Sequence, residues 1–215
     1  MIGKLVPGAL LASALLCASA NGETWAIDGH KSSLTVHVFK SGLLSAFGHN
    51  HEVRAAVASG SVANGEKPSV EIAVDARRMT VLDPDLAPAK RAEVQKRMLG
   101  PDVLDVTKFP EIRFKSTAVR PLGEGRWRVE GVLALHGHSV PLSFEVTGAK
   151  ERFHGSATVS QRAFGIQPIS AGGGTVNVKD EVKVDFDIAT ASPYVLAAFS
   201  AAGAGKSLHR RSRSS

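Results

Sequence analysis

Two histidine pairs are the residues of this chain whose type and spacing could do chemistry. His49 and His51 lie in FGHNHEV (47–53), and His136 and His138 lie in ALHGHSV (134–140). A spacing of two residues places both side chains of a pair on one face of an extended strand. Because neutral imidazoles bind zinc, copper or nickel, two pairs that meet could supply up to four ligands to one metal ion.

Three other interpretations of these histidines compete with the metal site. The side chains could cap strand ends and hydrogen-bond to loop backbone, or one or two of them could contact the polar head of an amphiphilic ligand. The letters HNH at 49–51 resemble a nuclease motif, but a strand is expected after them instead of a metal-bound hairpin and helix. The chain also has no serine elbow, phosphate loop or cysteine nucleophile, so no catalytic residues and no enzyme activity are predicted.

The elements that must position the histidines are predicted by a strict alternation of apolar and charged side chains. In 140–147 and 181–188, for example, every second residue is apolar, which is typical of antiparallel strands with one wet face. One helix is predicted over 89–100, between Pro88 and the pair Gly100-Pro101. About eight such strands and one helix in a single domain predict a mainly β fold, either a closed barrel or a sandwich. The predicted strands are 33–39, 51–62, 70–76, 111–118, 126–135, 140–147, 152–163 and 181–188.

The two ends of the chain differ from this body. Residues 1–20 combine a basic start, an apolar run and the motif Ala18-Ser19-Ala20, which predicts a secretory signal peptide cleaved after Ala20 and a periplasmic or secreted protein. The formal charge of +6 comes largely from the last twelve residues, which hold four cations and no acid. We therefore expect a body of 21–192 and a flexible basic tail of 193–215, which could touch an anionic membrane surface; no nucleic-acid partner is expected.

Four segments in order resemble the YceI-like family of bacterial exported lipid-binding proteins. They are WAIDGHKSSLTVHV (25–38), RMLGPDVLDVTKFPEIRFKST (97–117), GVLALHGHSVPLSFEV (131–146), and QRAFGI (161–166) with VKDEVKVDFDI (178–188). The resemblance implies an elongated antiparallel, lipocalin-like barrel. It also implies an apolar cavity for a polyisoprenoid or another long-chain amphiphile, such as an isoprenoid quinone or a fatty-acid derivative. It implies no catalytic residues and no required cofactor.

The alternation and the order of the strands then predict the residues of the site. Up-and-down connections would place both histidine pairs, the helix and the loop 164–177 at one mouth of the barrel. The side chains expected to face the cavity are Val36, Val38, Phe114, Leu133, Leu135, Leu142 and Phe144. Those expected at its rim are Leu43, Leu44, Phe47, His49, His51, Met98, Leu104, Phe164 and Ile166. A metal site of His49, His51, His136 and His138, and a structural domain without a ligand, remain the alternatives.

Overall fold

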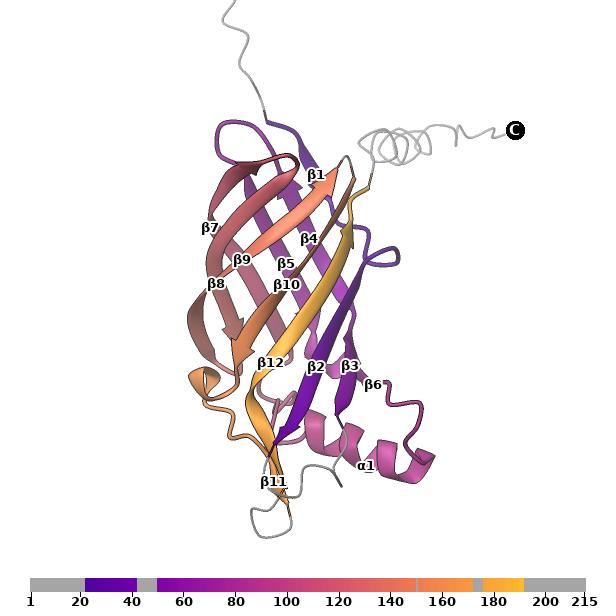
Figure 1. The fold of residues 1–215 in the computed structure, drawn as a ribbon. Coiled ribbons are helices and arrows are strands. Elements are labelled where there is room, and N and C mark those ends of the chain that lie inside the picture. Colours follow the sequence, from indigo (N-terminus) through magenta and orange to yellow (C-terminus); the bar gives the residue numbers. More distant parts are fainter. Residues whose placement is uncertain (1–21, 42–49, 150, 172–175, 192–215) are drawn as a thin grey trace, which may run out of the picture.

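The alternating segments form one antiparallel sheet that curls around an interior, with a single helix across one end (Figure 1). The computed structural model describes residues 22–41, 50–149, 151–171 and 176–191. The predicted signal peptide and basic tail lie outside these residues. The elements are β1 (Thr24–Ala26), β2 (Ser33–Ser41), β3 (His51–Ala55), β4 (Val57–Ala63), β5 (Ser69–Asp75), β6 (Thr80–Val81), α1 (Pro88–Leu99), β7 (Glu111–Gly123), β8 (Arg126–Leu135), β9 (His138–Ala149), β10 (Arg152–Ser160), β11 (Ser170–Ala171) and β12 (Val176–Ala189), with short 3-10 turns at Ala76–Arg78 and Arg162–Phe164.

The sheet closes on itself through one bent strand. β3 and β4 are separated by Ala56 alone, and the two halves join the two sides of the remaining sheet. Ala55 of β3 pairs with Leu34 of β2, whereas Val57 of β4 pairs with Val74 of β5. On one side of the bent strand, β2 pairs with β3, and β1 continues the line of β2 by pairing with β4. On the other side, β5 pairs with β4, and β6 continues the line of β5 by pairing with β3. The architecture is therefore a closed, lipocalin-like antiparallel barrel.

The strand count explains how this barrel relates to the predicted eight strands. β1 with β2, β3 with β4, and β5 with β6 each act as one long strand that is interrupted, and β11 is a short addition beside β12. The circuit of the barrel then contains eight strands, as the alternation predicts, although twelve separate strands are present in the described residues. Eight strands give an interior that side chains can fill or that can hold one small ligand.

Helix α1 lies across the end of the barrel at which β2 ends and β3 begins (Figure 1). We call this the α1 end, and the opposite end, where β1 lies, the far end. The helix begins with Pro88 at its first position and ends at Leu99, with Gly100 as its C-cap, so both ends lie one residue before the predicted bounds. Among the described residues, no helix has the length and apolar character that a membrane crossing requires.

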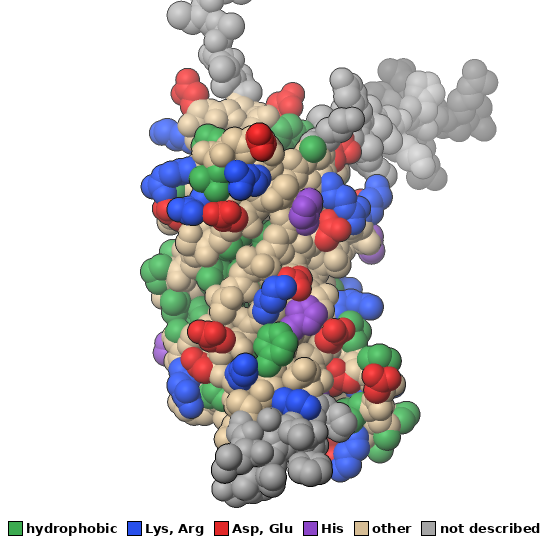
Figure 2. Space-filling model, in the orientation of Figure 1, with side chains coloured by type: hydrophobic (Ala, Val, Ile, Leu, Met, Phe, Trp, Pro, Cys, Tyr) green, Lys and Arg blue, Asp and Glu red, His purple; other side chains and the backbone are tan. Residues whose placement is uncertain are grey.

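The two faces of the barrel differ in chemistry. Outward side chains form cross-strand ion pairs, such as Lys115 with Glu71 at 2.6 Å and Arg128 with Glu145 at 2.8 Å. The visible surface is accordingly a mixture of acidic and basic side chains (Figure 2). Because these pairs are well exposed, each contributes little to stability, about 0–1 kcal/mol. Their main effect is to keep the outer face polar, so that the apolar face of each strand turns inward.

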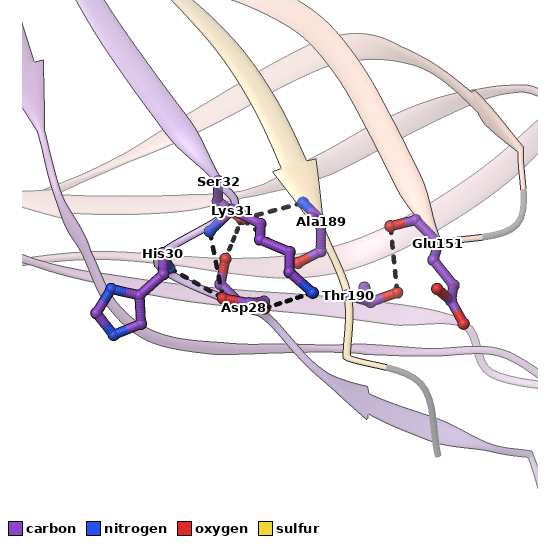
Figure 3. Close-up of polar contacts among 7 residues, drawn as sticks. All are labelled: Asp28, His30, Lys31, Ser32, Glu151, Ala189 and Thr190. Atoms are coloured by element: carbon purple, nitrogen blue, oxygen red, sulfur yellow. Dashed lines mark hydrogen bonds and ion pairs between the residues drawn. The ribbon is translucent and has the colours of Figure 1, made fainter. Parts of the chain in front are cut away.

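A turn at Asp28 fixes the far end of the barrel, where the chain passes from β1 to β2 (Figure 3). The Asp28 carboxylate accepts hydrogen bonds from the backbone N–H groups of His30 at 3.0 Å and Lys31 at 3.2 Å. The Ser32 hydroxyl donates to the carbonyl of Asp28 and accepts from the backbone N–H of Ala189, the last residue of β12. The turn thus ties the start of β2 to the end of β12.

The hydrogen bonds of this turn stabilise the ionised form of Asp28. Partial burial raises the pKa of the Asp28 carboxyl, but the N–H donors of His30 and Lys31 and the nearby Lys31 ammonium outweigh it, so the pKa lies below its ordinary value. A carboxyl whose pKa is lowered by folding binds its proton less readily in the folded state. Its contribution to stability is therefore fully present above the ordinary pKa of an aspartate and is lost as the pH falls through the lowered value.

We expect Asp28→Asn to lower the free energy of unfolding at about pH 7 and to have a smaller effect near pH 3, because the native carboxyl is then becoming protonated as well. Urea unfolding followed by circular dichroism at both pH values measures this difference. Asp102→Asn, at an exposed site, is the control and should change little at either pH. An equal loss of stability for Asp28→Asn at the two pH values would contradict the proposed role of its charge.

Candidate ligand-binding site

The barrel encloses a cavity of about 510 Å³ that extends along its length. Met98, in the last turn of α1, and Leu104, in the segment after the helix, line the cavity at the α1 end. Trp25 of β1 and Trp127 of β8 line it at the far end. Between them the wall is built from the inward side chains of the strands. Pockets of roughly 300–1,000 Å³ are typical of sites for small molecules.

The interior is hollow because its side chains do not reach across to one another. Val36, Leu133 and Leu142 all point into the cavity, yet each is only half-buried, since part of its surface faces empty space. In the described wall, the polar side chains are those of Asn64, Ser69 and Gln161, near the two ends, and none is charged. The site can therefore accept an apolar body along its middle and polar groups at its ends.

Most of the predicted site residues that the structure describes lie in this wall. Every second residue of a strand points inward, and the register of neighbouring strands sets these inward residues opposite one another. Four rim candidates, Leu43, Leu44, Phe47 and His49, lie outside the described residues. The predicted residues that line the cavity are Val36, Val38, Met98, Leu104, Phe114, Leu133, Leu135, Leu142, Phe144 and Ile166.

Two of the rim candidates, His51 and Phe164, are not among the residues that line the cavity wall. His51 is at the α1 end, but its Nδ1 lies 2.5 Å from Oδ2 of Asp83. The other oxygen of Asp83 accepts a hydrogen bond from the backbone N–H of Glu52 at 2.8 Å. Phe164 is buried, with 3% of its surface exposed, in a core cluster that it shares with the wall residues Val53 and Val74. His51 thus supports the mouth of the barrel through Asp83, and Phe164 contributes to the core.

The second histidine pair lies at the hairpin between β8 and β9, also at the α1 end (Figure 1); His136 is in the turn, and His138 is the first residue of β9. His136 and Gly137 both have positive φ values, 50° and 76°, as a two-residue type I′ hairpin turn requires. Nδ1 of His136 lies 3.1 Å from the carbonyl oxygen of Phe164, and its ring packs on Phe109 with 4.7 Å between ring centroids. This histidine therefore fastens the hairpin to the neighbouring loops.

The metal-site alternative gains no support from this geometry. The rings of His136 and His138 stack with their centroids 6.5 Å apart, and one nitrogen of His136 and one of His51 already contact protein groups. Within the described ranges, no group of three or more histidine, cysteine, aspartate or glutamate side chains could share a metal ion. His49 lies outside those ranges, so the four-histidine site remains an untested prediction.

Sequence reasoning missed the far half of the cavity. Trp25, Trp127, Phe153 and Phe186 all line the wall there or in its middle. A signal was present for Trp127, because it alternates with the outward residues Arg126 and Arg128 as cavity residues do. Trp25 stands in a strand of three residues, which is too short for any alternation to be recognised.

Three phenylalanine rings form a continuous belt across one side of the cavity. Phe144 of β9 lies between Phe114 of β7 and Phe186 of β12, with ring centroids 5.2 Å and 5.4 Å away. The tilted and edge-on arrangements of these rings are favourable for aromatic pairs. All three rings line the cavity, so the belt sets its width at this level.

Two inward-facing glycines provide the space that the belt occupies. A Cβ atom at Gly131 of β8 would lie 2.5 Å from the ring of Phe114, and one at Gly155 of β10 would lie 2.7 Å from the ring of Phe186. Five neighbouring strands, β7 to β10 and then β12, thus contribute phenylalanine and glycine in turn. An aromatic ring that covers a strand glycine compensates for the packing that the glycine lacks.

Comparisons with known proteins give a consistent result. The model of the YceI-like domain matches residues 25–190. A UPF0312 protein of Pseudomonas putida (strain W619) is 33% identical over 105 residues, which cover 44% of this chain and 55% of that protein. A UPF0312 protein of Pseudomonas savastanoi pv. phaseolicola is 37% identical over 86 residues, covering 35% of this chain and 45% of that protein. The chain thus spans about half the length of the curated relatives it matches.

Solved structures share the architecture as well. The crystal structure of Burkholderia cenocepacia BcnA has a TM-score of 0.55 with this chain at 20% sequence identity, and the match covers 77% of this chain and 99% of that one. At this level of identity the likeness concerns the fold alone.

We expect Gly131→Ala to lower the free energy of unfolding by about 1–3 kcal/mol, because the added methyl would lie 2.5 Å from both the Lys115 carbonyl oxygen and the Phe114 ring and would force the wall to shift. Chemical denaturation measures the loss. Combining it with Phe114→Leu, which removes the ring, should make the double variant more stable than the sum of the single effects predicts. If the losses in the free energy of unfolding simply add in the double variant, the glycine is not needed to accommodate the Phe114 ring.

Proposed function

The chain belongs to the YceI-like family, and from this premise we propose that it binds one long-chain amphiphile in the barrel cavity. The candidates are a polyisoprenoid, an isoprenoid quinone or a fatty-acid derivative. The observation that carries the proposal is a cavity of about 510 Å³ with an uncharged, almost wholly apolar wall in its described part. Such a wall offers nothing to a charged or sugar-like ligand along most of its length.

The size of the cavity fits an alkyl or isoprenoid chain. Water takes about 30 Å³ per molecule in the liquid, so 510 Å³ corresponds to roughly 17 molecules of that size. Methylene groups are of similar bulk, which gives a buried chain of about 15 carbon atoms. Burying each methylene contributes about 0.8 kcal/mol, or about 12 kcal/mol in total before the costs of association and ordering are subtracted. Tight binding then needs no strong polar contact.

The polar head of the amphiphile would remain at one end of the cavity. Among the wall residues that the structure describes, the polar side chains are Asn64 and Ser69 at the far end and Gln161 at the α1 end. The Gln161 amide donates to the carbonyl oxygen of Lys179 at 2.8 Å, and the Asn64 side-chain oxygen accepts from the backbone N–H of Glu23 at 2.7 Å. These groups orient a head without holding a charge.

We propose sequestration or transport as the role, without any bond-making step. In the described wall of the cavity no side chain is acidic or basic, so general acid–base chemistry has no group there to perform it. The proposal includes no resident metal or cofactor. Export to the periplasm or beyond follows from the sequence of residues 1–20 and is part of the same proposal.

Filling part of the cavity should weaken ligand binding strongly. Val36 and Leu133 face inward from strands on different sides of the barrel, so the double variant Val36→Trp/Leu133→Trp would occupy the space of the ligand. If the two rings exclude about four methylenes, the loss is about 3 kcal/mol, and the affinity for the fluorescent fatty acid cis-parinaric acid should fall about a hundredfold. Fluorescence titration measures it.

The matched control places the same two tryptophans on the outer face of the same strands, as Thr35→Trp/Val132→Trp. It should bind cis-parinaric acid within a few-fold of the unmodified chain. Native mass spectrometry of the protein purified from its host then identifies the natural ligand. A co-purified long-chain lipid supports the proposal, whereas a stoichiometric metal without lipid favours the metal alternative. If neither a lipid nor a metal co-purifies and the protein binds no fatty acid, a structural role is left.

A further inference from the structure

Helix α1 covers the α1 end of the cavity without being buried itself. Five of its residues form a half-buried stripe at helical spacing towards the barrel, and no residue of the helix is fully buried. Val94, Met98 and Leu99 of this stripe pack against the core cluster at the mouth, and Met98 also lines the cavity. The stripe is completed by Arg91 and Gln95.

Few polar contacts hold the helix to the barrel. The side chain of Gln95 accepts from the backbone N–H of Val81 at 2.7 Å and donates to the carbonyl of Met79 at 2.8 Å. The Arg91 guanidinium donates to the carbonyl oxygen of Asp83 at 3.3 Å. The helix is thus a separate element that lies over the mouth, with its other face turned away from the protein.

The outward face of α1 is basic. The helix carries Lys90, Arg91, Lys96 and Arg97 against one acid, Glu93, and that acid is paired with Lys90 at 3.0 Å. Lys96 and Arg97 are exposed, lie in the last turn beside Met98, and have no acidic partner in the described part of the chain. Two uncompensated cations therefore stand next to the entrance of an apolar cavity.

We propose that the outward face of α1 is the surface on which the protein docks to an anionic lipid bilayer. Its cations complement negatively charged headgroups, and each cation near such a surface strengthens binding appreciably. Figure 1 shows the helix across the barrel end, so that a bilayer contacted by α1 would face the mouth of the cavity.

Docking in this orientation gives an amphiphile a short path between bilayer and cavity. Met98 belongs to both the helix and the cavity wall, so an alkyl chain that passes α1 would leave the membrane and enter the barrel without crossing open water. This second step rests on the proposed function. The docking step does not, because it depends only on the charges and position of the helix.

Neutralising the two free cations tests the docking. In the full chain, Lys96→Gln/Arg97→Gln should weaken partitioning onto vesicles of roughly 30% phosphatidylglycerol in phosphatidylcholine by about 30-fold, about fivefold for each charge. The control, Lys67→Gln/Arg126→Gln, removes the same charge from exposed positions at the far end and should change partitioning less than twofold or so. Vesicle sedimentation without added amphiphile measures both, and circular dichroism confirms that both variants are folded.

The proposal is wrong if both variants lose vesicle partitioning equally, or if the helix variant loses none. It is also wrong if the unmodified chain partitions as strongly onto pure phosphatidylcholine as onto the vesicles that contain phosphatidylglycerol. A helix variant that instead abolishes self-association would show that a second copy of the chain covers this face. Partitioning of the unmodified chain should also weaken at high salt, a readout that needs no variant. If docking holds while cis-parinaric acid does not bind, the proposed function fails and the docking surface stands.

Discussion

Closure of the sheet at the bent strand β3–β4 is the constraint on which the rest of the molecule depends. Backbone groups in a sheet must be paired, and an open edge leaves a row of them without partners. Because residues 51–63 pair with β2 on one side and with β5 on the other, the hydrogen bonds of the barrel are completed by the backbone itself. Side chains are then not required to fill the centre. Closure alone leaves open whether the interior is filled, and here the inward side chains leave a cavity of about 510 Å³.

The sequence was informative wherever a residue's environment follows from its strand alone. Alternation predicted the inward positions of β2, β7, β8 and β9, and the proline and glycine signals predicted α1 to within one residue. It could not reveal contacts between segments far apart in the chain. His51 meets Asp83, 32 residues later and in a loop, and nothing in FGHNHEV announces that partner. The phenylalanine–glycine contacts escaped for the same reason, since each joins two strands.

The histidines illustrate how a chemical motif can serve a structural purpose. Pairs with metal-ligand spacing occur at the α1 end as predicted for His51, His136 and His138. Of these three, however, His51 is held by the carboxylate of Asp83 and His136 by the backbone carbonyl of Phe164. Such polar contacts fix the loops at the mouth of the barrel. The apolar wall and the polar rim thus have separate tasks, and titratable groups belong to the rim.

The contact of a ring with a strand glycine also bears on how such a pocket can change over evolutionary time. Gly131 and Gly155 have no side chain to rearrange, so exchanging the ring above either of them alters the free volume while the backbone stays where it is. If the cavity binds a long-chain ligand as proposed, single substitutions at Phe114 or Phe186 would therefore adjust the selectivity for chain bulk in discrete steps. Divergence of ligand preference within one unchanged scaffold would then need few mutational steps.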